Sequence, residues 1–210
     1  MANPKQSDWD KLVRIAKYLL GHKRYVMKFS IQRGVYAINC FGDSDFAGDA
    51  VTRKSTSGGI MMLGDHVIKS WSTNQSVIAL STGEAELYAI NKSAATGMGG
   101  QSILNDLGTK LDLRIFTDAT TGKSLASRRG LGKVRHIAVN ELWIQHHVQE
   151  KSLTLVKIKN KLNPSDLLTK HLTKAEVQQI MEHLQHMYEK GRSAAAPKLV
   201  SKEGVPVEGA

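Results

Sequence analysis

The chain has 210 residues, a formal net charge of +10 and a hydrophobic share of 41%. This length suits one domain of ordinary size with additional elements, and the hydrophobic share is enough for a core. The one cysteine, Cys40, excludes an internal disulfide and a zinc site built from cysteines. Because no apolar run approaches the ~20 residues that cross a bilayer and no signal peptide follows Met1, we expect a non-secreted protein without a membrane partner.

The excess of positive charge favours a polyanionic partner such as nucleic acid or an acidic membrane surface. Its distribution is more informative than its total, because nine Lys or Arg residues but only two acidic residues lie between Lys123 and Lys161. This basic segment is the part of the chain that we expect to lie nearest to a nucleic acid backbone.

Hydrophobic periodicity and turn residues predict the elements of the first half of the chain. In chain order these are a helix over 8–20, strands over 25–30 and 35–41, a loop over 43–57 and a hairpin of strands over 59–63 and 66–71. A turn at Arg33-Gly34 joins the first two strands, and Gly64-Asp65 forms the turn of the hairpin.

A long helix is predicted next, because Ser81-Thr82-Gly83-Glu84 matches a capping box. It should run toward Leu107, although three glycines in its middle each cost about 1 kcal/mol and would allow a kink or an early end near Gly97. The remaining elements are a strand over 111–117, a short helix after 118, a loop over 130–132, a helix over 137–149, a strand over 153–158, a helix from 163, a last helix from 173 to about 188 and a disordered tail over 191–210. Antiparallel strands followed by alternating strands and helices predict an α/β fold with a mixed sheet and helices on its faces.

Glu86 is the most informative of four acidic residues. Its neighbours on the predicted helix face are small or apolar: Ala89, Ile90 and Ser93. If this face meets the sheet, the carboxylate is costly unless it is paired with a positive charge or bound to a metal. If Glu86 instead lies partly exposed at the edge of the helix, it needs no such partner. Glu84 is a poorer candidate because the capping box already explains it.

The other three acids follow predicted strands or open a helix. Asp43 comes directly after the strand 35–41, but Asp45 has the same parity along an extended chain, so periodicity does not choose between them. Asp118 ends the strand 111–117, where it is either a site residue or a helix cap. Asp166 lies in the first turn of the helix after Pro164, where an acid also favours the helix dipole.

These four acids offer oxygen atoms alone as ligands. Sites of this kind favour Mg²⁺ or Mn²⁺ over zinc. Two such ions about 4 Å apart can activate a water and stabilise the leaving oxygen when a phosphodiester is cleaved.

Six motifs in the chain resemble, in order, the ribonuclease H domain of copia-type retrotransposon Pol polyproteins. They are FGDSDFAGD over 41–49, RKSTSGG over 53–59, SWS over 70–72, IALSTGEAE over 78–86, RHI over 135–137 and DLLTK over 166–170. The resemblance covers about residues 34–173, and the helix over 8–20 is similar to the connection that precedes this domain. The resemblance therefore implies a connection over 1–33 and a ribonuclease H domain over 34–173. The remaining residues are predicted from their own pattern and composition to form an extra helix over 174–190 and a disordered tail over 191–210.

The resemblance also implies a fold and an activity. The fold is a ribonuclease H-like sheet of five strands, three antiparallel and then two parallel, with helices on both faces. The activity is hydrolysis of the RNA strand of an RNA–DNA hybrid during reverse transcription. The reverse transcriptase and integrase parts of the same polyprotein would be partners, and the chain would work in the cytoplasm, in a virus-like particle, or in the nucleus.

By motif position, the resemblance assigns two Mg²⁺ ions, with Mn²⁺ as the alternative, to four catalytic and metal-binding acids: Asp43, Glu86, Asp118 and Asp166. It selects Asp43 over Asp45. The candidates for contacts with the phosphates of the hybrid are basic residues in one segment: Arg128, Arg129, Lys133 and Arg135. The hybrid would be recognised by its shape and its 2′-hydroxyls rather than by its sequence.

The sequence departs from the family pattern in one place. Cellular type 1 enzymes carry a histidine before the last core helix, whereas this chain has Lys159-Asn160-Lys161-Leu162 there. The main alternative to an active enzyme is an inactive or co-opted domain that holds nucleic acid without cutting it. An integrase-like member of the superfamily is a further alternative, which the position of Glu86 on the first long helix disfavours.

Overall fold

The computed structural model describes residues 4–130, 132, 136–137 and 139–193. The chain separates into two compact units, one made of its two ends, Met1–Lys28 with Gln185–Ala210, and the other of Phe29–Leu184. The predicted boundaries after residues 33 and 173 remain predictions, and most of the predicted disordered tail lies outside the described residues. No helix in the described part of the chain is long and apolar enough to cross a membrane.

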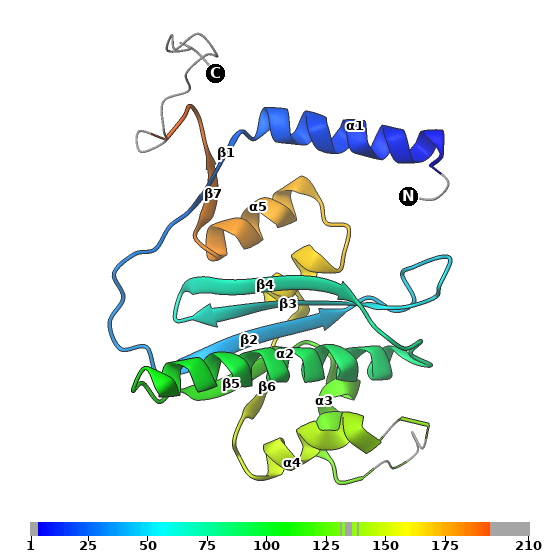
Figure 1. Ribbon diagram of the computed structural model, residues 1–210, viewed down its shortest axis with the longest axis vertical. Coiled ribbons are helices and arrows are strands. Elements are labelled where there is room, and N and C mark those ends of the chain that lie inside the picture. Colours follow the sequence, from blue (N-terminus) through cyan, green and yellow to red (C-terminus); the bar gives the residue numbers. More distant parts are fainter. Residues whose placement is uncertain (1–3, 131, 133–135, 138, 194–210) are drawn as a thin grey trace. The chain divides into compact units, whose positions relative to one another are not determined.

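The larger unit is built on a five-stranded sheet with the order β4-β3-β2-β5-β6 (Figure 1). Its strands are β2 (Ala37–Ser44), β3 (Thr56–Leu63), β4 (His66–Asn74), β5 (Asp112–Thr117) and β6 (Thr154–Lys157). The first three are antiparallel, and β5 and β6 run parallel to β2. This topology is the ribonuclease H-like arrangement that was predicted, with β2 at the centre.

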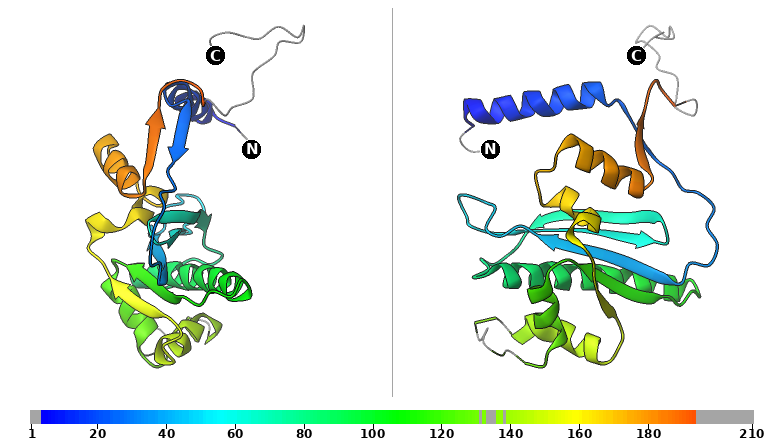
Figure 2. Two further views of the ribbon diagram at one scale, coloured as in Figure 1. Left: turned by 90° about the vertical axis from the view of Figure 1, so that its left-hand side faces the viewer. Right: turned by 180° about the vertical axis from the view of Figure 1, so that it is seen from behind.

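Helices pack on both faces of the sheet. They are α2 (Thr82–Asp106), α3 (Thr120–Ser127), α4 (Trp143–Gln149) and α5 (Lys174–His183), with short 3-10 helices η1 (Val139–Leu142), η2 (Asn160–Leu162) and η3 (Pro164–Leu168). Successive side chains of β3 point to opposite faces of the sheet, as in any strand. Met61 accordingly packs in the core cluster under α2, whereas Ile60 packs with residues of η3 and α5. Figure 2 shows α2 on one side of the sheet and η3 with α5 on the other.

The glycines of α2 neither kink nor end the helix, which continues to Asp106. Gly97 is buried, and a methyl group at this position would lie 2.5 Å from Cδ1 of Leu113 and 2.9 Å from Sγ of Cys40. The missing side chain therefore lets α2 approach β2 and β5 closely. Gly99, on the exposed side, has no neighbour within 4 Å of such a methyl group.

Three predicted helices differ from the structure. The helix predicted over 137–149 is divided into η1 and α4, and the helix predicted from residue 163 is the single 3-10 turn η3. The last helix ends at His183, because Gln185 has a left-handed conformation (φ 57°) that turns the chain.

The residues after this turn form β7 (His186–Glu189), which pairs antiparallel with β1 (Arg24–Met27) in the smaller unit. The strand predicted over 25–30 is shorter than expected, because β1 ends at Met27. The first helix, α1 (Gln6–Gly21), begins and ends close to its predicted bounds and contains no buried residue.

Two alanine substitutions in α2 should have opposite effects on stability. Gly99→Ala should raise the free energy of unfolding by up to about 1 kcal/mol, because alanine has the better helix propensity and its methyl group meets nothing. Gly97→Ala gains the same propensity but overpacks the core, and should be destabilising by about 1–3 kcal/mol. Denaturant unfolding at one pH measures both, and equal gains would contradict the close packing at Gly97.

Candidate metal centre

The central strand β2 presents Asp43 near its end. Asp43 is 1% exposed and lies opposite Gly58 of β3. A methyl group at Gly58 would lie 2.6 Å from Cγ2 of Thr169 and 2.9 Å from Cβ of Leu168. The glycine therefore leaves room for the chain after η3 to pass over the sheet beside Asp43.

The helix α2 begins where its sequence predicted, but its cap differs from the capping box. The Ser81 hydroxyl accepts a hydrogen bond from the Glu84 amide at 3.2 Å, as expected. The Glu84 carboxylate, however, accepts from the amide of Leu80 at 2.9 Å rather than from that of Ser81. The same carboxylate accepts from the Tyr88 hydroxyl at 2.9 Å and lies 2.9 Å from Nε2 of His136, so all of its contacts lie outside the acid cluster.

Three acids from separate elements meet at the end of the sheet. Asp43 comes from β2, Glu86 from the second turn of α2, and Asp118 from the residue after β5. Each has one oxygen within 4.8 Å of an oxygen of the other two. Because β2 and β5 are parallel neighbours, their carboxyl ends bring Asp43 and Asp118 to the same edge of the sheet.

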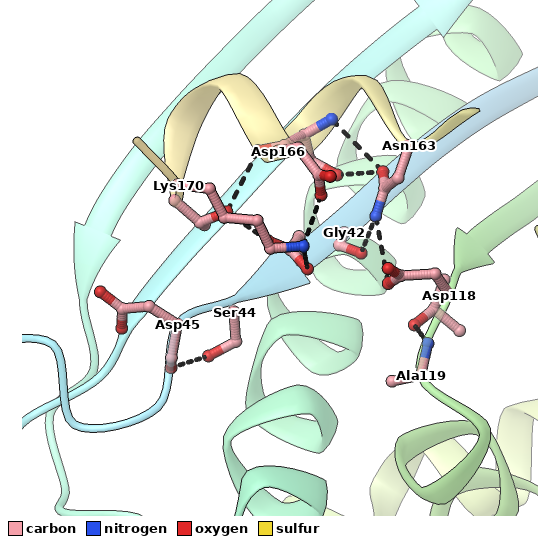
Figure 3. Close-up of polar contacts among 12 residues, drawn as sticks. Gly42, Ser44, Asp45, Asp118, Ala119, Asn163, Asp166 and Lys170 are labelled. Atoms are coloured by element: carbon pink, nitrogen blue, oxygen red, sulfur yellow. Dashed lines mark hydrogen bonds and ion pairs between the residues drawn. The ribbon is translucent and has the colours of Figure 1, made fainter. Parts of the chain in front are cut away.

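Asp166 is connected to this group through a lysine. The ammonium of Lys170 donates to Oδ1 of Asp166 at 2.8 Å and to Oδ1 of Asp43 at 3.3 Å. The Thr169 hydroxyl donates to the other oxygen of Asp43. Figure 3 shows Asp166, Lys170 and Asp118 gathered around the end of β2.

Asp45 does not take part in the cluster. Its carboxylate accepts a hydrogen bond from the amide of Thr56 and points away from Asp118 and Asp166 (Figure 3). Its contact closes the loop between β2 and β3, where the Asp45 amide also donates to the carbonyl of Thr56 at 3.2 Å. The structure therefore brings Asp43, and not Asp45, together with Glu86 and Asp118.

The acids of the cluster disfavour one another's ionisation. Burial and the nearby charges of Asp43 and Asp118 raise the pKa of Glu86 to about 8, against a smaller lowering by Lys170. Burial also raises the pKa of Asp43 and of Asp166, although Lys170 opposes the rise at both. A metal-free cluster at neutral pH is therefore electrostatically costly.

The cluster fits a hard divalent cation. One oxygen of Glu86, Oε2, is buried and has no hydrogen-bond partner among the described residues. A buried carboxylate oxygen without a donor is costly unless a cation satisfies it. Oxygen atoms from three acids are the ligand set that Mg²⁺ and Mn²⁺ prefer, so the site is compatible with binding a divalent metal.

Two supporting residues were not predicted as part of the site. Lys170 could have been recognised from its spacing of four residues after Asp166, which is typical of an ion pair on a helix. Asn163 lies before η3 and places an amide 3.4 Å from Oδ1 of Asp118 and 3.3 Å from the carbonyl of Gly42. No local pattern in the sequence indicated that contact.

The predicted phosphate-binding residues are described in part. Arg128 is the C-cap residue of α3 and is partly buried. Arg129 is exposed, and its Nε donates to Oε1 of Gln149 at 3.1 Å. Lys133 and Arg135 lie outside the described residues.

The order of the sheet and the presence of an acid group at the end of its central strand agree with the arrangement that the resemblance implied. Among known proteins, no family model matches the chain. The Pol polyprotein of transposon TNT 1-94 from Nicotiana tabacum is 28% identical over 172 residues, which are 81% of this chain and 13% of that protein. The Pol polyprotein of transposon RE2 from Arabidopsis thaliana is 28% identical over 181 residues, 85% of this chain and 12% of that protein.

These matches to Pol polyproteins of plant transposons confirm the predicted resemblance to the Pol polyproteins of copia-type retrotransposons. The chain spans about one eighth of the length of these curated relatives, at 12–13%. Among solved structures, LC11-RNase H1 in complex with an RNA/DNA hybrid has a TM-score of 0.43 and 15% identity, covering 62% of this chain and 92% of that chain. The N-terminal ribonuclease H domain of a Mycobacterium tuberculosis protein has a TM-score of 0.44 and 15% identity, covering 69% of this chain and 98% of that one.

Two conservative changes in α2 should shift the pH dependence of stability in opposite directions when metal is absent. The folded protein holds the proton of Glu86 up to about pH 8, whereas the unfolded chain loses it near the ordinary pKa of 4.5, so Glu86 lowers stability progressively between these values. At pH 8, Glu86→Gln should therefore be more stable than the unaltered protein, on the order of a few kcal/mol. Below pH 4 the difference should vanish, because both states are then protonated.

Glu84→Gln is the matched control. Burial alone would raise the pKa of Glu84, but its bonds to His136, Leu80 and Tyr88 together lower it. Glu84 therefore contributes stability above pH 4.5 that is lost as the pH falls through its folded pKa, and Glu84→Gln should be less stable at pH 8. Denaturant unfolding in EDTA at pH 4 and pH 8 measures both variants. A destabilised Glu86→Gln at pH 8 would contradict the electrostatic account of the cluster.

Proposed function

We propose that the chain is an active endonuclease that cuts the RNA strand of RNA–DNA hybrids with the help of two divalent metal ions. The observation that carries this proposal is the meeting of Asp43, Glu86 and Asp118, where one oxygen of Glu86 has no hydrogen-bond partner among the residues that the structure describes. A domain that only held nucleic acid would gain nothing from three mutually repelling acids, because nucleic acid is itself an anion.

In this proposal, Asp43, Glu86, Asp118 and Asp166 hold two Mg²⁺ ions, with Mn²⁺ as an alternative. Such ions activate a water and stabilise the departing oxygen in phosphodiester cleavage. Asp43 is the acid common to both groups, because it belongs to the triad and also shares Lys170 with Asp166. The sheet and α2 fix the triad rigidly, which preserves its geometry when a polyanion approaches.

The substrate and the partners are proposed from the positive charge of the chain and from its sequence similarity to transposon polyproteins. Arg128, Arg129, Lys133 and Arg135 would contact the phosphate backbone, and the excess of positive charge would attract the hybrid. Because the relatives are transposon Pol polyproteins, the reverse transcriptase and integrase parts of such a polyprotein are the proposed partners. The proposed place of action is the cytoplasm, inside the particle of the element, or the nucleus.

The test is a cleavage assay with a hybrid labelled on its RNA strand. The purified chain should cut this strand in Mg²⁺ or Mn²⁺ and not in EDTA. Glu86→Gln and Asp118→Asn should each lose more than about 100-fold in rate, because removal of groups that merely support metal ligands already costs 10–100-fold. Asp45→Asn is the matched control, since Asp45 lies on the same segment and outside the cluster, and it should keep most of the activity.

Two results would contradict the proposal. Binding of the hybrid without cutting, at every concentration of Mg²⁺ and Mn²⁺ tried, would favour the alternative of an inactive or co-opted nucleic-acid-binding module. Equal losses in Asp45→Asn and Glu86→Gln would contradict the assignment of Glu86, rather than Asp45, to the metal site.

A further inference from the structure

Lys170 places a positive charge inside the proposed metal site. Its ammonium lies 2.8 Å from Oδ1 of Asp166 and 3.3 Å from Oδ1 of Asp43, whose side chains are 8% and 1% exposed. Within the part of the chain that the structure describes, no other basic side chain forms an ion pair with any of the four acids. The lysine therefore acts as the protein's own counter-cation for the cluster.

The two parts of the cluster differ in how well their oxygens are satisfied. On the side of Glu86 and Asp118, one buried oxygen of Glu86 has no hydrogen-bond partner among the described residues. On the side of Asp166, the ammonium of Lys170 already bridges two carboxylates, and the Thr169 hydroxyl takes the second oxygen of Asp43. A bound cation would therefore satisfy an open oxygen on the first side, whereas Lys170 already supplies a positive charge on the second.

The lysine can leave this position. Its side chain is 35% exposed, although both partners are buried. A lysine ammonium is strongly hydrated and sits on a flexible four-carbon stem, so it can move into solvent while the two acids stay in place. The carboxylate oxygens that it releases are the kind of ligand that a second divalent ion needs.

We propose that Lys170 occupies the position of the second cation in the free protein, so that the protein alone binds one divalent ion and takes a second only when this lysine moves away. This inference rests on the proposed metal-dependent function and adds the order in which the two ions bind. The first ion would bind at the triad of Asp43, Glu86 and Asp118. The second ion would bind at Asp43 and Asp166, when the phosphate of a substrate contributes further negative charge near the site.

Counting bound Mn²⁺ tests this directly. The full chain is titrated with Mn²⁺ at pH 7.5 without nucleic acid, and the free ion is measured by electron paramagnetic resonance. The unaltered protein should bind one Mn²⁺ per chain. Lys170→Met, which keeps the length and the apolar stem but removes the charge, should bind two, with the second ion at least about tenfold tighter because a competing charge a few ångströms away is gone.

Three further proteins complete the experiment. Lys174→Met is the matched control, because Lys174 is exposed at the start of α5 and makes no ion pair with the cluster in the described structure, and it should bind one ion. Lys170→Arg keeps the charge and should also bind one. Asp118→Asn should lose the first ion, which locates it at the triad.

The outcomes separate the two proposals. If Lys170→Met binds one ion exactly as the unaltered protein does, or if the unaltered protein already binds two ions of similar affinity, the role of Lys170 is wrong and the metal site stands. If neither protein binds Mn²⁺, the metal site and the role of Lys170 are both wrong. The count for the unaltered protein decides between one ion and two even if a variant fails to fold.

Discussion

The carboxylates of the acid cluster repel one another, and the elements around them must hold them together against this repulsion. Asp43, Glu86 and Asp118 come from three elements and each has an oxygen within 4.8 Å of the other two. Burial and these charges raise the pKa of Glu86 to about 8. Such an arrangement costs stability unless a cation compensates it, so the cluster is compatible with binding a divalent metal.

The surrounding architecture holds the acids in spite of this repulsion. The central strand β2 is paired on both sides, which prevents Asp43 from moving away from its neighbours. Gly97 allows α2, the helix that also carries Glu86, to lie close against β2 and β5. Gly58 leaves room for the segment that carries Lys170. Repulsion within the cluster lowers the stability of the fold, and packing around the cluster offsets this loss. Such a trade-off is typical of functional sites.

Local patterns in the sequence predicted the parts of this fold that depend on neighbouring residues. The strands of the sheet, the hairpin and the long helix were all evident from periodicity and turn residues, and the helix face that carries Glu86 followed from the spacing of its small neighbours. Periodicity alone could not choose between Asp43 and Asp45, because both have the same parity. The family motifs favoured Asp43, and the contact of Asp45 with the Thr56 amide now supports that choice.

Local sequence patterns could not predict contacts between segments that lie far apart in the chain. The residues after His183 were predicted to continue a helix, but they pair with Arg24–Met27, which lies at the other end of the chain. The contact of Asn163 with Asp118 likewise joins segments 45 positions apart. Gly97 was interpreted as a weakness in the helix, whereas it is a packing residue whose reason lies in β2 and β5.

Anomalous X-ray scattering from crystals soaked in Mn²⁺ would show whether the acid cluster holds a cation, since it locates the ion without any assay of activity. If the acid cluster exists to hold a cation, the strongest anomalous peak should lie among the carboxylates of Asp43, Glu86 and Asp118. It should be within bonding distance of Oε2 of Glu86, which lacks a hydrogen-bond partner in the described part of the chain. The same peak should be absent from crystals of Asp118→Asn. A map without a peak at the triad, in crystals that hold Mn²⁺ elsewhere, would contradict the account.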